Sequence, residues 1–416
     1  MFQKEKRPEE VFTPRASEVN DSMYVDRPEL EESLKKGLRS NKHLLIYGES
    51  GSGKTWLYKK VLKKEGVKVH VANLANASRL KSINEEFKNL VNRKQISRKT
   101  AYAETKEASL NAGVGSGKLN HQDQYTIADI EPFEACIKQI RKEAGDAPAI
   151  LVLDNLETIW SDENLLSELA NVITLLDDES YAKYKVNFLI VGVPGDLRKY
   201  YQQTPNLSTV ANRIRELPPV SRMTLEQCRD LVYQGFITEL EYQIYDIEKL
   251  TSHISWVTDR LPQRIHEYCW ELALLGESHG KKITNDLLDQ ADQSWLKESL
   301  SSNYTVVESV MNERDTKVRR RNQTLYALGL VKSEEFKGSD IESIVRQEFP
   351  ESTKDKTLNI PQILSGLSNK ENPIIKRSPK EDSYCFSDPK YRMCLRAMLR
   401  KKANSDLVEK LPVSNF

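Results

Sequence analysis

The chain has 416 residues, of which 38% are hydrophobic and 30% charged, and its formal net charge is +1. This length predicts two to three domains, and the composition predicts a globular, well-solvated protein. No apolar stretch approaches the roughly 18 residues of a membrane span, and the start, MFQKEKRPEE, lacks the apolar core of a secretory signal. The five cysteines show no paired spacing. We therefore expect a cytoplasmic protein with reduced thiols and no membrane partner.

The first informative segment is a short apolar run followed by a glycine-rich sequence. Residues 44–47 (LLIY) are typical of a buried parallel strand, and residues 48–55 spell GESGSGKT. A helix is expected from Trp56 onward. Glycines in this pattern let successive backbone N–H groups point at phosphates, and the helix adds its positive N-terminal dipole. The segment therefore predicts a P-loop that binds ATP.

Each position of the loop has an expected role. Lys54 would reach the β- and γ-phosphates, and the Thr55 hydroxyl would be a ligand of Mg²⁺. The predicted nucleotide-binding residues of the loop are Gly48, Glu49, Ser50, Gly51, Ser52, Gly53, Lys54, Thr55 and Trp56. A second glycine-rich stretch, residues 113–118, has no strand before it and no Ser or Thr after its lysine, so we interpret it as a turn.

Further strands are predicted at residues 67–71, 149–154 and 187–193. Strands that alternate with helical stretches predict a parallel sheet with helices on both faces. Asp154 stands at the carboxyl end of its strand, where such sheets place ligands, and it is predicted to hold Mg²⁺ directly or through water. Residues 93–129 form a connection longer than a minimal one, and on its own this length is consistent with a surface loop.

The second half of the chain is predicted to be mainly helical. Apolar residues recur at helical spacing in residues 224–236, 244–254, 262–275 and 285–300. Residues 301–416 then combine helices at 323–331, 341–349 and 359–367 with a hairpin at 373–386 and a last helix at 390–402. This last region carries about five more basic than acidic side chains, whereas the remainder is slightly acidic.

With these motifs in place, the chain resembles the AAA+ ATPases, in particular their origin-recognition-like and STAND-like branches with a C-terminal winged helix. The resemblance implies that the segment with Val25 and Arg27 packs on the adenine. It implies that Arg213, or else Arg215, reaches the γ-phosphate of a neighbouring subunit. It implies that Arg264, in LPQRIH, contacts the γ-phosphate from a helical lid. If the chain resembles the initiator-type members, residues 93–129 are an insertion that contacts DNA or a neighbouring subunit; otherwise they are a surface loop.

Two departures from the family pattern predict slow hydrolysis. Most active members have Glu directly after the strand Asp to polarise the attacking water, whereas this chain has Asn155. Glu157 is the nearest carboxylate and either takes that role or is structural. The strand expected to carry a polar sensor ends in Gly192, Val193 and Pro194 instead of a clear Asn or Thr.

The predicted fold is therefore an α/β P-loop NTPase (AAA+) parallel sheet with a helical lid, followed by an α+β winged-helix domain. The expected boundaries are an N-terminal extension at 1–21, a base at 22–221, a lid at 222–300 and a winged helix at 301–416. The expected catalytic residues are Lys54, Asp154, Glu157, Arg213 and Arg264, the metal ligands are Thr55 and Asp154, and the cofactors are ATP and Mg²⁺.

Two functions remain open at this stage. One is a homo-oligomeric, DNA-associated ATPase switch, in which the basic run Lys317, Arg319, Arg320 and Arg321 and the wing residues Lys376, Arg377 and Lys380 contact phosphates. The other is a STAND-like regulatory ATPase that controls an effector protein, for example in bacterial defence or transposition. In that case the winged helix would pack on the ATPase domain.

Overall fold

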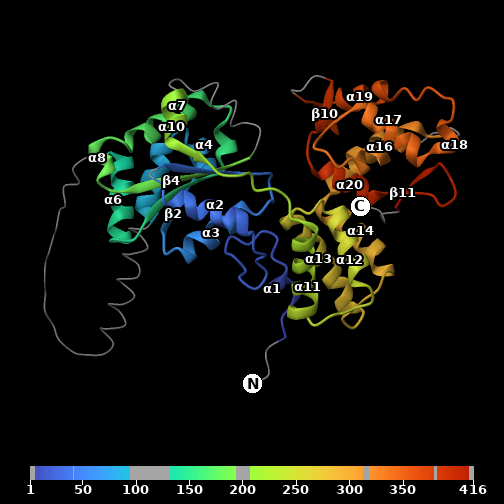
Figure 1. The fold of residues 1–416 in the computed structure, drawn as a ribbon, viewed down its shortest axis with the longest axis horizontal. Coiled ribbons are helices and arrows are strands. Elements are labelled where there is room, and N and C mark those ends of the chain that lie inside the picture. The colour runs from blue at the N-terminus through green and yellow to red at the C-terminus, as the bar shows by residue number, and fades with distance from the viewer. Residues whose placement is uncertain are drawn as a thin grey trace. The chain divides into compact units, whose positions relative to one another are not determined.

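The computed structural model describes residues 5–40, 42–93, 131–193, 207–312, 318–378 and 382–411. The chain forms two compact units (Figure 1). The sheet unit is Asp26–Ser221, and the helical unit combines Met1–Val25 with Arg222–Phe416. The predicted insertion beyond Arg93 and the glycine turn at 113–118 lie outside the described residues. Within the described residues, no helix is both long enough and apolar enough to cross a membrane.

The sheet unit is built on a parallel sheet of five strands in the order β2-β3-β4-β1-β5. This confirms the predicted α/β fold. The strands are β1 (His43–Tyr47), β2 (Lys68–Asn73), β3 (Ala149–Asp154), β4 (Val186–Gly192) and β5 (Ile214–Glu216). β5 was not expected from the sequence, because its three residues, IRE, are largely charged and pair with the sheet on one side only.

Helices cover both faces of this sheet (Figure 1). Successive side chains of a strand point to opposite faces, so Leu44 and Ile46 pack with α2 and α3, while Leu45 belongs to the core on the other face. Residues 83–93 are also helical. The remaining helices of this unit are α2 (Pro28–Leu38), α3 (Lys54–Lys64), α4 (Leu74–Leu80), α6 (Pro132–Ala144), the 3-10 helix η1 (Leu156–Ile159), α7 (Glu163–Leu175), α8 (Glu179–Ala182) and α10 (Leu207–Arg213).

The helical unit contains the four helices predicted for residues 224–300, with shifted ends. α12 begins three residues later than expected, because Asp246 accepts the Lys249 N–H and thereby caps the helix. The elements are α11 (Leu225–Tyr233), the π-helical turn η2 (Gln234–Glu239), β6 (Gln243–Ile244), α12 (Ile247–Val257), α13 (Pro262–Ser278), β7 (Lys282–Ile283), α14 (Asp286–Ser299) and α15 (Ser301–Val310).

The N-terminal segment is part of this helical unit. It contains the short helix α1 (Pro8–Val11), and the side chains of Phe12 and Met23 are almost completely buried. A Cβ atom added at Gly235 would lie 2.4 Å from the Phe12 ring, so the segment packs directly on the η2 backbone. The Thr13 N–H also donates to Nδ1 of His266 at 3.2 Å.

The last part of the chain has the winged-helix order of elements. Its three-stranded antiparallel sheet has the order β8-β10-β9. β8 comes between the first two helices of this region, and β9 and β10 come before the last one. The expected last helix at 390–402 is too long, since α20 ends at Met398 and the next residues pair as β11 with β12. The elements are α16 (Arg320–Leu330), β8 (Glu335–Lys337), α17 (Gly338–Glu348), α18 (Pro350–Thr353), α19 (Ile360–Ser368), β9 (Ile375–Arg377), β10 (Ser383–Phe386), α20 (Lys390–Met398), β11 (Leu399–Lys401) and β12 (Val408–Lys410).

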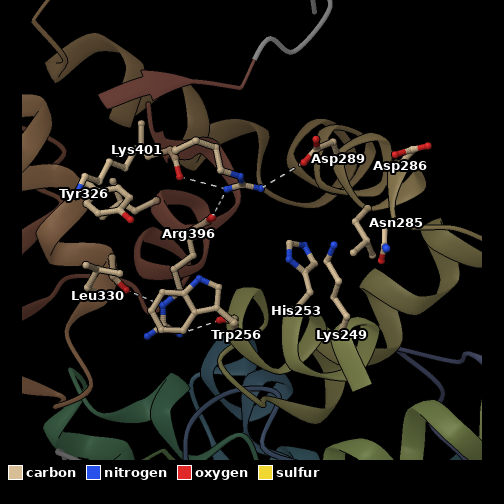
Figure 2. A pocket seen from close by; sticks show the side chains of 15 residues that line it. Lys249, His253, Trp256, Asn285, Asp286, Asp289, Tyr326, Leu330, Arg396 and Lys401 are labelled. Atoms are coloured by element: carbon tan, nitrogen blue, oxygen red, sulfur yellow. Dashed lines mark hydrogen bonds and ion pairs between the residues drawn. The ribbon is translucent and has the colours of Figure 1, made fainter. Parts of the chain in front are cut away.

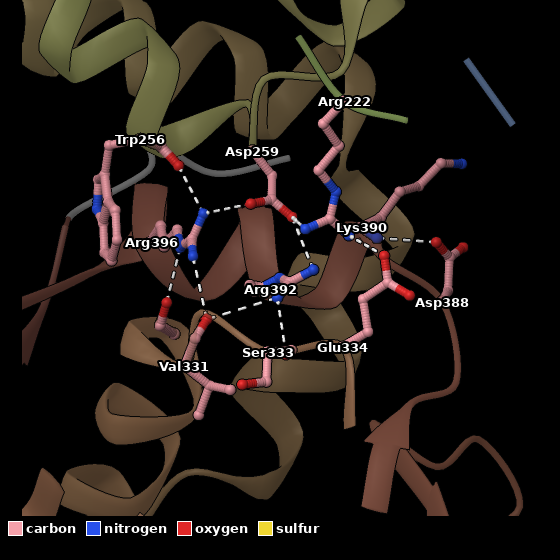
Figure 3. A network of polar contacts seen from close by, with 11 residues as sticks. Arg222, Trp256, Asp259, Val331, Ser333, Glu334, Asp388, Lys390, Arg392 and Arg396 are labelled. Carbon is pink, nitrogen blue, oxygen red and sulfur yellow. Dashed lines mark hydrogen bonds and ion pairs between the residues drawn. The ribbon is translucent and has the colours of Figure 1, made fainter. Parts of the chain in front are cut away.

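A buried ionic cluster joins α20 to the helices of residues 222–300 (Figure 3). The Asp259 carboxylate lies 3.0 Å from Arg222, 2.8 Å from Arg392 and 2.9 Å from Arg396. Arg396 also stacks on Trp256, with its guanidinium carbon 3.9 Å from the ring centre. Burial lowers the pKa of Arg396 to about 10, so it stays charged at neutral pH. We call these four charged residues the Asp259 cluster.

Candidate nucleotide site

The glycine-rich loop leaves the carboxyl end of β1 and leads directly into α3, as the sequence predicts. Gly51 and Gly53 have positive φ angles of 81° and 90°, a conformation that glycine adopts without steric strain. α3 begins at Lys54, so its unsatisfied N–H groups and positive dipole end face the loop. This is the backbone geometry of an anion-binding cradle.

Gly48 is required for a different reason, since its backbone is in close contact with the segment at Val220. A Cβ atom at position 48 would lie 2.4 Å from the Val220 carbonyl oxygen and 2.9 Å from the Ser52 hydroxyl oxygen. Any side chain at this position would push the loop away from residue 220.

The ammonium group of Lys54 lies inside the loop. It donates to the carbonyl oxygens of Gly48, at 2.8 Å, and Glu49, at 2.9 Å. Burial lowers the pKa of Lys54, whereas the carboxylates of Glu157, Asp154 and Glu49 oppose that shift. An ammonium group has three donors, so one remains for a phosphate oxygen.

Asp154 and Thr55 are the two predicted metal ligands. Asp154 ends β3, and the charges of Lys54 and Lys59 act on its carboxylate. Burial raises the pKa of Asp154, and the N–H of Asn155, which donates to it at 2.9 Å, opposes that shift most strongly. Thr55 is the second residue of α3. The described residues contain no group of three or more His, Cys, Asp or Glu side chains that could hold a metal. Mg²⁺ in proteins is usually bound by one or two carboxylates together with substrate phosphates and water.

Asn155 is held by a partner that the sequence analysis missed. Its side-chain amide donates to the Asn73 side chain at 2.9 Å, and Asn155 itself has a positive φ of 63°. Asn73 is the last residue of β2 and pairs in register with Asp154. The strand prediction stopped at residue 71, so Asn73 was not recognised at the carboxyl edge of the sheet. The position where most active family members carry Glu is thus a fixed, neutral amide.

Glu157 is exposed in the first turn of η1, and its charge acts on Lys54. The structure therefore brings it to the phosphate loop. We expect Glu157→Gln to leave binding of Mg²⁺-ATP unchanged and to lower the hydrolysis rate about 100-fold, the usual contribution of a general base. A phosphate-release assay with the matched variant Glu163→Gln, which alters an exposed glutamate at the start of α7, controls for the loss of one charge. Hydrolysis at the parent rate in Glu157→Gln would show that the residue is not the base.

Arg27 and Val25, predicted to lie at the adenine, have different surroundings. Arg27 is 7% exposed, and its Nη1 donates to the carbonyl oxygens of Ser52 and Ser221. Val25 is half-buried and packs against the core of the helical unit. Contact of either residue with a base stays a prediction.

Arg213 lies at the opposite edge of the sheet from its own P-loop. It directly precedes β5, whose first residue pairs with His43 at the start of β1. Its charge and that of its ion-pair partner Asp177 act on His43. β1 has five residues and so spans roughly 16 Å between these edges. The runner-up, Arg215, is exposed on β5.

Arg264 belongs to the helical unit. It lies in the first turn of α13 and forms a buried ion pair with Glu267 at 2.6 Å. Its predicted role at the phosphates is not tested by these contacts.

A sequence model of the AAA domain family matches residues 38–201, the segment that contains the P-loop, β3 and the sheet around them. Residues 38–201 form an AAA+ P-loop ATPase domain. No curated protein matches the chain in sequence.

Solved structures resemble the chain beyond this AAA+ domain. A Walker-type ATPase of Pyrococcus abyssi has 14% identity and a TM-score of 0.53, over 93% of this chain and 99% of that one. The ADP form of the Aeropyrum pernix ORC2 protein has 16% identity and a TM-score of 0.49, over 94% and 96%. Cdc6p from Pyrobaculum aerophilum has 15% identity and a TM-score of 0.43, over 94% and 96%. Of the three, only the Pyrococcus match is close enough to show a shared fold.

The residues of the AAA+ domain fit ATP with Mg²⁺. The open backbone at Gly51 and Gly53 and the third N–H donor of Lys54 suit the phosphates of ATP. Thr55 and Asp154 are the residues that would supply oxygen ligands for Mg²⁺. When bound, the metal would neutralise phosphate charge.

The helical unit contains a separate cavity of about 600 Å³ (Figure 2). Lys249 and His253 of α12, Asp286 and Asp289 of α14 and Lys401 of β11 lie around it. Its two arginines are already neutralised within the chain. Arg396 belongs to the Asp259 cluster, and Arg400 is paired with Asp292, which is completely buried. The lining therefore shows no clear charge preference for a ligand.

Proposed function

We propose that this chain is a slow AAA+ ATPase that works as an ATP-dependent, homo-oligomeric switch associated with duplex DNA. The observation that carries the proposal is the position of Arg213, at the opposite edge of the sheet from its own phosphate loop. An arginine at that edge is too far from its own nucleotide to contact it. In the proposed assembly Arg213 exchanges its ion pair with Asp177 for the γ-phosphate of a neighbouring copy. Such a site is complete only in an assembly, so ATP hydrolysis and assembly depend on each other.

Slow turnover follows from the residue after Asp154. Asn155 is neutral and is held by Asn73, so it cannot accept a proton from water at neutral pH. Glu157 is the nearby carboxylate whose charge reaches Lys54, and an exposed base is less well positioned than one fixed at the end of a strand. A nucleotide that is hydrolysed slowly persists long enough to control an assembly.

Association with DNA is supported by the wing of the winged helix. Lys376 and Arg377 are exposed on β9, where phosphates can approach them. In a winged helix α19 would be the helix that faces the major groove. Its exposed residues include Pro361, Gln362 and Gly366, and of these three only Gln362 has a side chain that can hydrogen-bond to a base edge. We therefore expect binding through phosphates with little sequence preference. Lys380 and Lys317 lie outside the described residues.

Part of the positive excess in residues 301–416 is not available to DNA. Arg392 and Arg396 are buried in the Asp259 cluster, and Arg400 is paired with Asp292. Arg320 of the basic run donates to Gln323 and to the Ser352 carbonyl oxygen. The proposed contact surface is therefore the wing and not the whole region.

The test is the charge-reversal variant Lys376→Glu/Arg377→Glu. Duplex DNA affinity should fall for all sequences, and the slope of log affinity against log salt should decrease by about two units, because each lost phosphate contact removes about one. Fluorescence anisotropy at several salt concentrations measures both quantities, while ATP affinity should be unchanged. Lys282→Glu/Lys297→Glu, which reverses two exposed charges outside the winged helix, is the matched control.

The alternative is a STAND-like regulatory ATPase that controls an effector protein. One observation favours this alternative. The Asp259 cluster fixes α20 of the winged helix to the preceding helices of the same unit. In that case the parent protein would bind no duplex DNA even at low salt, and wing reversal would alter ATP turnover or assembly with the effector instead.

A further inference from the structure

The segment that ends the sheet unit is in direct contact with the phosphate loop. We call residues 217–221 the connector, because the chain passes into the helical unit immediately after them. The Leu217 N–H donates to the Leu45 carbonyl oxygen at 3.0 Å, and the Val220 N–H donates to that of Tyr47 at 2.8 Å. The connector therefore continues along β1 until the loop begins, and at Gly48 the two backbones touch.

Arg27 adds a second link between the connector and the loop. One nitrogen of its guanidinium, Nη1, donates to the carbonyl oxygen of Ser52 in the loop at 3.0 Å and to that of Ser221 at 3.1 Å. Ser52 is completely buried and Arg27 is 7% exposed. Hydrogen bonds from a charged donor in a buried setting are among the stronger ones in proteins. A single side chain thus holds both backbones in one arrangement.

Both passages of the chain between the two units lie next to this side chain. The first is the Val25–Asp26 bond, immediately before Arg27, and the second is the bond between Ser221 and Arg222. Beyond the second passage, Arg222 enters the Asp259 cluster at 3.0 Å, and the Met223 N–H donates to the Arg260 carbonyl oxygen at 3.0 Å. Arg27 therefore holds the connector at Ser221, the residue directly before the chain enters the helical unit.

We propose that Arg27 is a positioning residue that couples the phosphate loop to the connector, and that it does not contact the base. When the phosphate loop is in its phosphate-binding conformation, the Ser52 carbonyl oxygen lies where Nη1 of Arg27 can donate to it and to the Ser221 carbonyl oxygen at once. If the connector moves, the Ser221 carbonyl oxygen leaves Arg27, and Arg27 no longer fixes the conformation of the phosphate loop. The coupling is reciprocal, so the connector position that favours phosphate is also the one that phosphate favours. This inference rests on the proposed nucleotide binding.

The test compares ATP with inorganic triphosphate, each with Mg²⁺, as ligands of the full-length protein. Arg27→Met removes the donor and keeps an apolar side chain. Calorimetry should show both ligands weakened by the same factor, between about tenfold and 100-fold, the range expected for lost hydrogen bonds to a charged group. Arg39→Met, an exposed arginine that follows α2, is the matched control and should bind both ligands like the parent.

A contact with the base predicts a different result. ATP binding would then fall while triphosphate binding stayed at the parent value, and that outcome would overturn the proposal. If the parent itself binds neither ligand, the proposed nucleotide function fails, which is distinct from failure of the coupling. Arg27→Lys keeps the charge on a different head group and serves if the methionine variant does not fold. It should weaken both ligands equally as well.

Hydrogen exchange measures the coupling directly. In the parent, saturating Mg²⁺-ATP should slow exchange of the Leu217 and Val220 amides, which donate to β1. In Arg27→Met, at a concentration that again saturates the site, ATP should slow these amides at least about tenfold less. Equal protection by ATP in parent and variant would show that the connector does not depend on Arg27.

Discussion

Lys54→Ala is expected to abolish measurable binding of Mg²⁺-ATP, with affinity at least about 100-fold lower than in the parent. The Lys54 ammonium is held inside the loop by the carbonyl oxygens of Gly48 and Glu49, and alanine leaves the loop without a cation for the phosphates. Isothermal calorimetry measures the change. Lys64→Ala, which removes an exposed lysine from the last turn of the same helix, should bind like the parent. Unchanged affinity in Lys54→Ala would contradict the assignment of the loop.

Mixed with a second variant, Lys54→Ala also tests whether ATP hydrolysis needs two copies of the chain. Arg213→Ala should bind ATP and fail to hydrolyse it, if Arg213 serves a neighbour. A mixture of Arg213→Ala and Lys54→Ala should regain part of the activity, because Arg213 of the second chain can serve the intact loop of the first. No activity in the mixture, together with no ATP-dependent assembly in a sizing experiment, would count against the oligomeric switch.

Asp259→Asn is expected to destabilise the helical unit by about 3–5 kcal/mol, the range for breaking a buried ion pair by removing one partner. Asparagine keeps the shape of aspartate and tolerates the left-handed conformation at this position, where φ is 52°. The substitution therefore keeps the shape, removes the charge and replaces one acceptor oxygen by an NH2 group, which donates and cannot accept. Arg392 and Arg396, whose side chains are 2% and 4% exposed, would be left without their buried counter-ion.

Chemical denaturation measures this effect, with the fluorescence of Trp256 and Trp295 as a signal from the helical unit. Asp355→Asn is the matched control, since Asp355 is exposed in the same unit and has a similar φ of 53°. It should change stability by less than about 0.5 kcal/mol, as surface substitutions usually do. An equally small change in Asp259→Asn would show that water or relaxation compensates the arginines.

The sheet and its phosphate loop were predictable because their signals are local. Four apolar runs mark four of the five strands, and the glycine-lysine-threonine spacing at residues 48–55 fixes the loop between a strand and a helix. β5 was not predicted because it is short and only its first residue, Ile214, is apolar and buried, while the two that follow are charged and exposed. β8 was missed for a similar reason: its three residues, EFK, have one apolar side chain between two charged ones.

The contacts that position the site were not predictable, since they join residues far apart in the sequence. Arg27 is hydrogen-bonded to Ser221, 194 residues away in the sequence, and Asn155 to Asn73, 82 residues away. A count of charges in residues 301–416 gave a basic surface, but pairing with Asp259 and Asp292 removes three arginines from it. Composition reports how many charges a region has, while only the fold reports how many are exposed.

Residues 8–25 contribute side chains to the core of the helical unit. Phe12 and Met23 lie against Gly235, although residues 26–221 separate them from it in the sequence. During synthesis on the ribosome, the N-terminal segment must therefore wait for almost 200 residues, the whole ATPase unit, before its partners emerge. A fragment that starts at Arg222 would leave Phe236 and neighbouring core residues uncovered. A shortened protein meant to isolate the helical and winged-helix part should therefore carry residues 5–25, joined to Arg222 through a linker in place of residues 26–221.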